Sequence, residues 1–162
     1  MDIQFVLELT VFKGHEGTVL NVKYSPYETN TICSGSCDES IRLWDIRSNK
    51  QINIFKGHTN YVRVIEYLPF VNNNNNNGDG TSIINSNIIC SGSEDNTIRF
   101  WDIRNNKQLH VIKGSQNEDG GIMSLTFLAL KNKENVSKKT DNSICNVNLC
   151  YGSIQGPIRI WG

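Results

Sequence analysis

The chain has 162 residues, and its 16 Lys and Arg balance its 16 Asp and Glu. A net charge of zero gives no electrostatic attraction to nucleic acid or to an anionic membrane surface, so direct nucleic-acid binding is not expected. No apolar run approaches the ~18 residues of a membrane span, and the N-terminus lacks the basic start of a signal peptide. We therefore expect a soluble intracellular protein of the cytoplasm or nucleus that does not contact a membrane.

Short runs of alternating apolar residues, separated by turn residues, follow one another along the chain. Such runs predict β-strands of about five residues. In chain order they lie at 8–12, 19–24, 31–34, 41–45, 51–55, 62–67, 88–91, 98–102, 108–112, 122–127, 148–151 and 158–161. No segment shows a convincing helical period, so the predicted class is all-β with twelve strands.

The strands belong to an internal repeat. Segment 33–47, CSGSCDESIRLWDIR, returns as segment 90–104, CSGSEDNTIRFWDIR, and a weaker copy occupies 150–162. The tryptophans of these copies, Trp44, Trp101 and Trp161, are 57 and 60 residues apart, and both spacings reduce to 43 when insertions of 14 and 17 residues are removed. The whole chain, 1–162, is therefore one repeat region with a single underlying period.

The repeats divide the chain at about 13–55, 56–112 and 113–162. The second repeat carries an Asn-rich insertion at 72–80 with six consecutive Asn, and the third carries a Lys- and Asn-rich insertion at 131–143. Low-complexity polar runs cannot bury apolar surface, so we expect loops that leave the scaffold unchanged.

Two dipeptides mark the repeats. Gly14-His15 precedes Trp44-Asp45, and Gly57-His58 precedes Trp101-Asp102 at the same adjusted spacing. Four strands per 43 residues between these markers resembles the WD40-repeat β-propeller family. The resemblance covers nearly the whole chain outside the insertions and implies three four-stranded blades.

The resemblance also implies a structural hydrogen-bond network inside each good blade. By motif position, the networks consist of His15, Ser34, Asp38 and Trp44 in the first repeat and of His58, Ser91, Asp95 and Trp101 in the second. Trp only donates, ionised Asp only accepts, and Ser and neutral His do both, so the four can form one directed chain. Ser, His and Asp are also the parts of a hydrolase triad. We favour the structural reading because the set occurs twice at one adjusted spacing with Ser in a strand, and we expect no catalysis.

The third repeat departs from this pattern. Ser115, Tyr151 and Gln155 stand where His, Ser and Asp are expected, so we predict that this blade lacks the network and is the least stable. Cysteines occupy one further position of all three repeats, as Cys33, Cys90 and Cys150. Three blades cannot converge on one ion, so we expect these thiols in the packed interior, with no metal and no cofactor.

Members of the family generally bind proteins or peptides at one rim, through three positions in each blade. Here those positions are Thr18, Leu20 and Cys37, then Tyr61, Arg63 and Glu94, and finally Gly121, Met123 and Ile154. The second set has the best binding chemistry, because aromatic and Arg side chains dominate interface energetics. We expect a non-catalytic protein-interaction scaffold. The alternatives are an RNA or ribonucleoprotein assembly factor, or a non-functional fragment of a longer WD-repeat protein.

Three blades are fewer than the four to eight of a typical propeller. Segment 8–12 matches a fourth strand and the chain ends after a third strand, as in propellers whose termini share a blade. Two explanations stay open. Either the chain is an incomplete propeller derived from a longer one, which we favour, or two chains close head to tail as a homodimer with six blades.

Overall fold

The structure is a computed structural model, and it describes residues 9–69, 87–115, 117–129 and 147–161. Both predicted insertions, 72–80 and 131–143, lie outside the described residues. Within the described residues all regular structure is β, in eleven strands. The same residues contain no helix long and apolar enough to cross a membrane.

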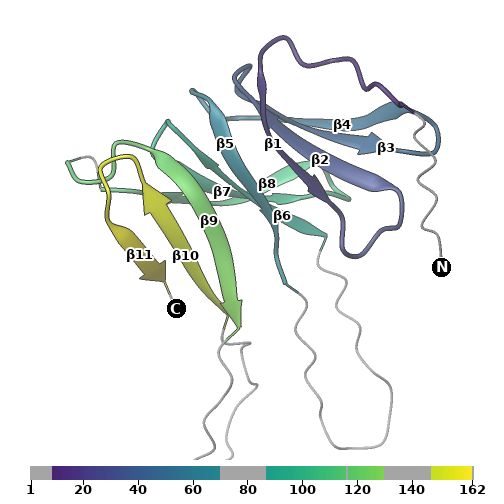
Figure 1. Cartoon of the computed structure of the whole chain (residues 1–162). Helices are drawn as coiled ribbons and strands as arrows, with labels where there is room; N and C mark the ends of the chain where they lie inside the picture. Colours follow the sequence, from purple (N-terminus) through teal and green to yellow (C-terminus); the bar gives the residue numbers. More distant parts are fainter. Residues whose placement is uncertain (1–8, 70–86, 116, 130–146, 162) are drawn as a thin grey trace, which may run out of the picture.

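The strands form three antiparallel sheets, which we call blades 1, 2 and 3 (Figure 1). Blade 1 has the order β1 (Val19–Tyr24), β2 (Thr31–Ser36), β3 (Ser40–Asp45), β4 (Lys50–Lys56). Blade 2 repeats it with β5 (Val62–Tyr67), β6 (Ile88–Ser93), β7 (Thr97–Asp102), β8 (Lys107–Lys113). Blade 3 consists of β9 (Ile122–Ala129), β10 (Val147–Ser153) and β11 (Ile158–Trp161). The all-β prediction is confirmed, and β1 and β5 have the predicted bounds.

One predicted strand is not formed. Residues 9–12, the described part of the run predicted at 8–12, make no strand, so blade 3 has three strands and ends at the edge of β11. The expectation of three four-stranded blades is corrected accordingly. The physical reason is that a strand needs a hydrogen-bonding neighbour, and residues 9–12 pair with no strand of the three sheets.

Neighbouring blades are held together by apolar contacts between their faces. One core cluster joins blade 1 to blade 2, and it includes Ile41, Leu43, Ile65 and Tyr67. A second joins blade 2 to blade 3 through Val64, Ile98, Ile122, Leu125 and others. Within the part of the chain that the structure describes, blade 2 therefore buries both of its faces, whereas blades 1 and 3 each bury one.

Glycine in the second strand lets the blades approach closely. A methyl group at Gly35 would lie 2.8 Å from Cγ1 of Val62, and one at Gly92 would lie 2.6 Å from Cγ2 of Ile122. Both contacts are shorter than van der Waals packing permits, so the first strand of the next blade rests directly on the backbone of the blade before it.

Candidate functional site

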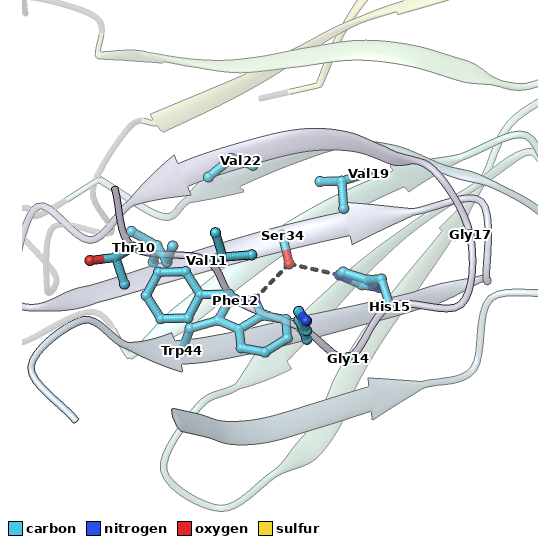
Figure 2. Close-up of a pocket in the computed structure, with 12 residues that line it drawn as sticks. Thr10, Val11, Phe12, Gly14, His15, Gly17, Val19, Val22, Ser34 and Trp44 are labelled. Atoms are coloured by element: carbon cyan, nitrogen blue, oxygen red, sulfur yellow. Dashed lines mark hydrogen bonds between the residues drawn. The ribbon is translucent and has the colours of Figure 1, made fainter. Parts of the chain in front are cut away.

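The four predicted network residues of blade 1 lie together. Figure 2 shows His15, Ser34 and Trp44. Trp44 Nε1 donates to Ser34 Oγ over 2.8 Å, and Ser34 Oγ lies 2.7 Å from His15 Nε2. The other ring nitrogen, Nδ1, lies 2.9 Å from the carboxylate of Asp38. Because a carboxylate only accepts, Nδ1 carries the proton and Nε2 accepts from Ser34.

Blade 2 repeats this geometry. Trp101 donates to Ser91 over 2.8 Å, and His58 lies 2.7 Å from both Ser91 and Asp95. Burial alone would raise the pKa of Asp95, but hydrogen bonds from His58 and Thr97 outweigh it and hold this pKa well below its usual range. Each carboxylate thus stays ionised and fixes the turn between the second and third strands.

The hydroxyl of each network serine is fully engaged. Ser34 and Ser91 are buried, and each receives a hydrogen bond from an indole while bonding to an imidazole. Ser91 is fully buried, and Ser34, which lines a hollow beside residues 10–12, is engaged on both sides, unlike the exposed nucleophile of a hydrolase. The geometry of the two sets is that of a hydrogen-bond clamp within a blade.

Blade 3 has a different network, which the sequence analysis missed. Asp119, fully buried, accepts from the backbone N–H of Ser115 at 2.6 Å, from Tyr151 Oη at 3.3 Å and from Arg159 Nε at 2.9 Å. Gln155, which aligns with the missing Asp, is exposed. The carboxylate of blade 3 therefore enters from the loop before β9 instead of the turn after β10.

The arginine that recurs at one position of the third strand could have indicated Asp119. Arg42 and Arg99 approach Asp38 and Asp95 at 3.6 and 3.8 Å, and Arg159 occupies the same third-strand position in blade 3. A cation conserved in the repeat while its acid is missing indicates that another acid replaces it. Glu118 and Asp119, in the extra residues of the third repeat, were the only acids between Lys113 and Ile122.

The cysteine column is only partly interior. Cys33 and Cys90 are fully buried, as expected, but Cys150 is half-buried. The expectation for Cys150 is wrong, because within the described residues no blade packs on that face of blade 3. Among the described residues no group of three His, Cys, Asp or Glu side chains could hold a metal ion.

A β-bulge interrupts the first strand of every blade at the same place. The pairing with the second strand skips Leu20 in β1, Arg63 in β5 and Met123 in β9. A bulge leaves one residue without a ladder partner and redirects its side chain. All three skipped residues are predicted rim residues.

The other rim residues lie at the same end of the blades, which we call the bulged edge. The backbone N–H of Cys37 donates to the carbonyl of Thr18 over 2.9 Å, and Glu94 donates likewise to Tyr61 over 3.0 Å. In blade 3, Ile154 donates to Gly121 over 3.0 Å. One hydrogen bond thus closes the end of each blade, and it joins two rim positions in each case.

On the bulged edge, the side chains of blade 2 contact one another directly. Arg63 Nε donates to Glu94 Oε1 over 2.6 Å, and its guanidinium lies 5.7 Å from the ring centre of Tyr61. Tyr61, Met123 and Ile154 are exposed there. An aromatic ring, a fixed ion pair and neighbouring apolar side chains are the components of a protein-binding patch.

Comparison with known proteins agrees with the fold. The family described as "WD domain, G-beta repeat" matches residues 7–45 and 49–102, more than half of the chain. The guanine nucleotide-binding protein subunit beta of Arabidopsis thaliana is 32% identical over 132 residues, which cover 78% of this chain and 31% of that protein.

Two further relatives have lower identity. The periodic tryptophan protein 2 homolog of Schizosaccharomyces pombe is 29% identical over 85% of this chain and 14% of its own length. The coronin-like protein of Saccharomyces cerevisiae is 25% identical over 65% of this chain and 17% of its own length. The chain thus spans less than a third of each of these relatives. With the family match and the repeated blades, this chain belongs to the WD-repeat family.

Proposed function

We propose that the chain is a non-catalytic binding module whose bulged edge holds a protein or peptide partner, centred on Tyr61, Arg63 and Glu94 of blade 2. The observation that carries the proposal is the bulge that skips Arg63. It redirects a long cationic side chain, which Glu94 and the ring of Tyr61 then fix. A side chain held in place before binding loses less conformational entropy when a partner arrives.

The chemistry of the edge favours a protein over a nucleic acid. Arg63 is the one cation among the nine rim positions, and its charge is balanced by Glu94. Nucleic-acid binding needs several unpaired Lys or Arg side chains that neutralise phosphates. Exposed Tyr61, Met123 and Ile154 instead provide apolar area with one polar anchor.

The hydrogen bonds of the two network serines support the proposal that the module is not catalytic. Ser34 and Ser91 are each held between an indole and an imidazole, so a nucleophilic role would require breaking the clamp. One relative is named as a subunit, and a subunit belongs to an assembly, which supports a role in binding.

The test is affinity capture with the wild-type chain and with the double variant Tyr61→Ala, Arg63→Ala. Ile52→Ala, exposed on the outer strand β4, is the matched control. A captured protein is then purified, and its direct binding is measured by titration calorimetry. We expect the double variant to weaken binding at least tenfold, which corresponds to about 1.4 kcal/mol, and the control to leave it unchanged. Equal affinity of all three chains would show that the partner binds elsewhere.

A further inference from the structure

The bulged edge continues from blade 2 to blade 3 through direct contacts. Gly121, the rim residue that precedes β9, packs on the turn of blade 2, because a methyl group there would lie 3.0 Å from Cα of Glu94. The same methyl group would lie 2.9 Å from Cδ1 of Ile154, in the turn between β10 and β11. Glu94 is bonded in turn to Tyr61 through its backbone N–H. These four residues therefore form one continuous surface across the junction of blades 2 and 3.

Two large apolar side chains stand at the ends of this surface. Tyr61 is 41% exposed on the blade 2 side, and Ile154 is 50% exposed on the blade 3 side. Beside Ile154, Gly120 and Gly121 have φ angles of +64° and +134°, which L side chains rarely adopt. The loop therefore keeps main chain instead of side chains at this point, and a partner's backbone can approach closely.

The ion pair of blade 2 leaves one donor group and one acceptor atom unused. Arg63 donates to Glu94 Oε1 from Nε, over 2.6 Å, and also from Nη2. Both bonds end on one oxygen, so within the described residues Arg63 Nη1 and Glu94 Oε2 have no hydrogen-bond partner. Both side chains are partly exposed. A free N–H donor beside a free carboxylate oxygen matches the C=O and N–H groups of a peptide backbone.

The charges around the junction favour an uncharged ligand segment over an acidic one. Glu94 already neutralises Arg63, and Arg159 is paired with Glu118 and Asp119. A partner's carboxylate on Arg63 would therefore be a second negative charge on one guanidinium, and it would be repelled by Glu94. The nine rim positions contain no unpaired cation, so the junction offers apolar contact and backbone hydrogen bonds instead of a site for an anion.

We propose that this junction binds an extended peptide segment through one large apolar side chain that has no acidic neighbour. Tyr61 and Ile154 pack on the two sides of that side chain. Beside it, Arg63 Nη1 donates to a backbone carbonyl and Glu94 Oε2 accepts from a backbone N–H. Main-chain hydrogen bonds then supply affinity, and the apolar contact supplies specificity. This assignment, which rests on the proposed function, gives Ile154 of blade 3 a part in holding the ligand.

The probe is a phage library of random peptides, selected on the immobilised wild-type chain. Selected peptides are synthesised, and their dissociation constants are measured by titration calorimetry. We expect a consensus with one large aliphatic or aromatic residue and no Asp or Glu beside it. Raising NaCl from about 50 mM to about 500 mM should change these constants less than about threefold, because binding neutralises no net charge. An acidic consensus, a steep loss of affinity with salt, or no peptide above background would overturn the proposal.

Ile154→Asp tests the contribution of blade 3, because it puts a charge where the apolar side chain packs. The side chain of Ile154 is exposed, so the variant should fold, and circular dichroism checks that its strands are intact. We expect the dissociation constants of the selected peptides to rise at least about tenfold. Leu109→Asp, which changes a side chain 51% exposed on β8, is the matched control and should bind the peptides like wild type.

Glu94→Gln gives a result that a merely structural role would not produce. The substitution removes the charge that neutralises Arg63, so peptides selected on this variant should gain Asp or Glu beside the apolar residue. An unchanged consensus would contradict the role of the ion pair in excluding anions.

The failure of this assignment can be told apart from the failure of the proposed function. Peptides that lose affinity for the double variant Tyr61→Ala, Arg63→Ala but not for Ile154→Asp would overturn the assignment and leave the proposed binding edge standing. Peptides that bind both variants like wild type would overturn the assignment as well, whereas the proposed function is decided by the captured protein.

Discussion

Arg159 Nε donates to the buried carboxylate of Asp119 over 2.9 Å, and this pair replaces the His-centred clamp in blade 3. The hydrogen bonds from Arg159 and Ser115 outweigh the effect of burial and lower the pKa of Asp119, so the carboxylate is charged at neutral pH. Removing one member of a buried ion pair destabilises a protein more than removing one member of an exposed pair. A substitution at Asp119 should therefore destabilise blade 3 selectively.

Asp119→Ala is expected to destabilise the chain by about 2–4 kcal/mol, because Arg159, Tyr151 and the Ser115 N–H all lose their acceptor. Glu118→Gln, which changes the exposed end of the same arginine pair, should cost no more than about 1 kcal/mol. Urea unfolding followed by circular dichroism measures both values. Equal decreases in the free energy of unfolding would show that the buried carboxylate stabilises the chain no more than the exposed one.

Acid should weaken the chain through the network carboxylates. The pKa of Asp95 lies below its ordinary value of 3.8 in the folded chain, so its stabilising contribution is complete above about pH 4 and is lost as pH falls through the lower, folded value. Asp95→Asn should be less stable at pH 7 by about 1–3 kcal/mol and should lose less stability between pH 5 and pH 2. The pKa values of Asp38, Asp45, Asp102 and Asp119 are also lowered, so these groups add to the pH dependence of stability. Parallel stability curves for wild type and variant would contradict this role.

The glycine column offers three matched substitutions. Gly35→Ala and Gly92→Ala place a methyl group against the next blade and should each cost about 1–3 kcal/mol of unfolding free energy. Gly152→Ala meets only the movable hydroxyl of Ser124 and should be neutral or slightly stabilising. A cost at Gly152 as large as at Gly92 would mean that close blade approach is not the cause.

Thiol labelling should distinguish the cysteines by burial. Burial raises the pKa of the Cys33 and Cys90 thiols far above the usual range, so both should resist iodoacetamide in the native chain. Among the four cysteines that the structure describes, Cys37 and Cys150 are half-buried and should react first, as read by peptide mass mapping. Rapid labelling of Cys33 or Cys90 would contradict the packed interior.

Much of the fold could be predicted because the repeat shows each strand more than once. The bounds 19–24 and 62–67 agree with β1 and β5, since alternating apolar residues and turns mark both ends. The partners Trp44, Ser34 and His15 could be proposed from family position, because two copies hold them at one adjusted spacing.

Other features depend on neighbours that a sequence pattern does not contain. Residues 9–12 alternate like a strand but have no adjacent ladder, so the pattern alone could not show that no strand forms. Cys150 fits its column, yet its burial depends on a blade that would have to follow β10 and β11. Asp119 escaped prediction because its loop has extra residues, which shift the acid out of its expected position.

The distribution of the two core clusters sets the order in which the blades can open. Blade 2 contributes Ile65 and Trp101 to one cluster and Val64 and Ile98 to the other. Stacked repeats gain stability from each neighbour, so the middle blade gains twice and the terminal blades once. Amide protons should therefore exchange with solvent first in β1 and β11 and last in β6.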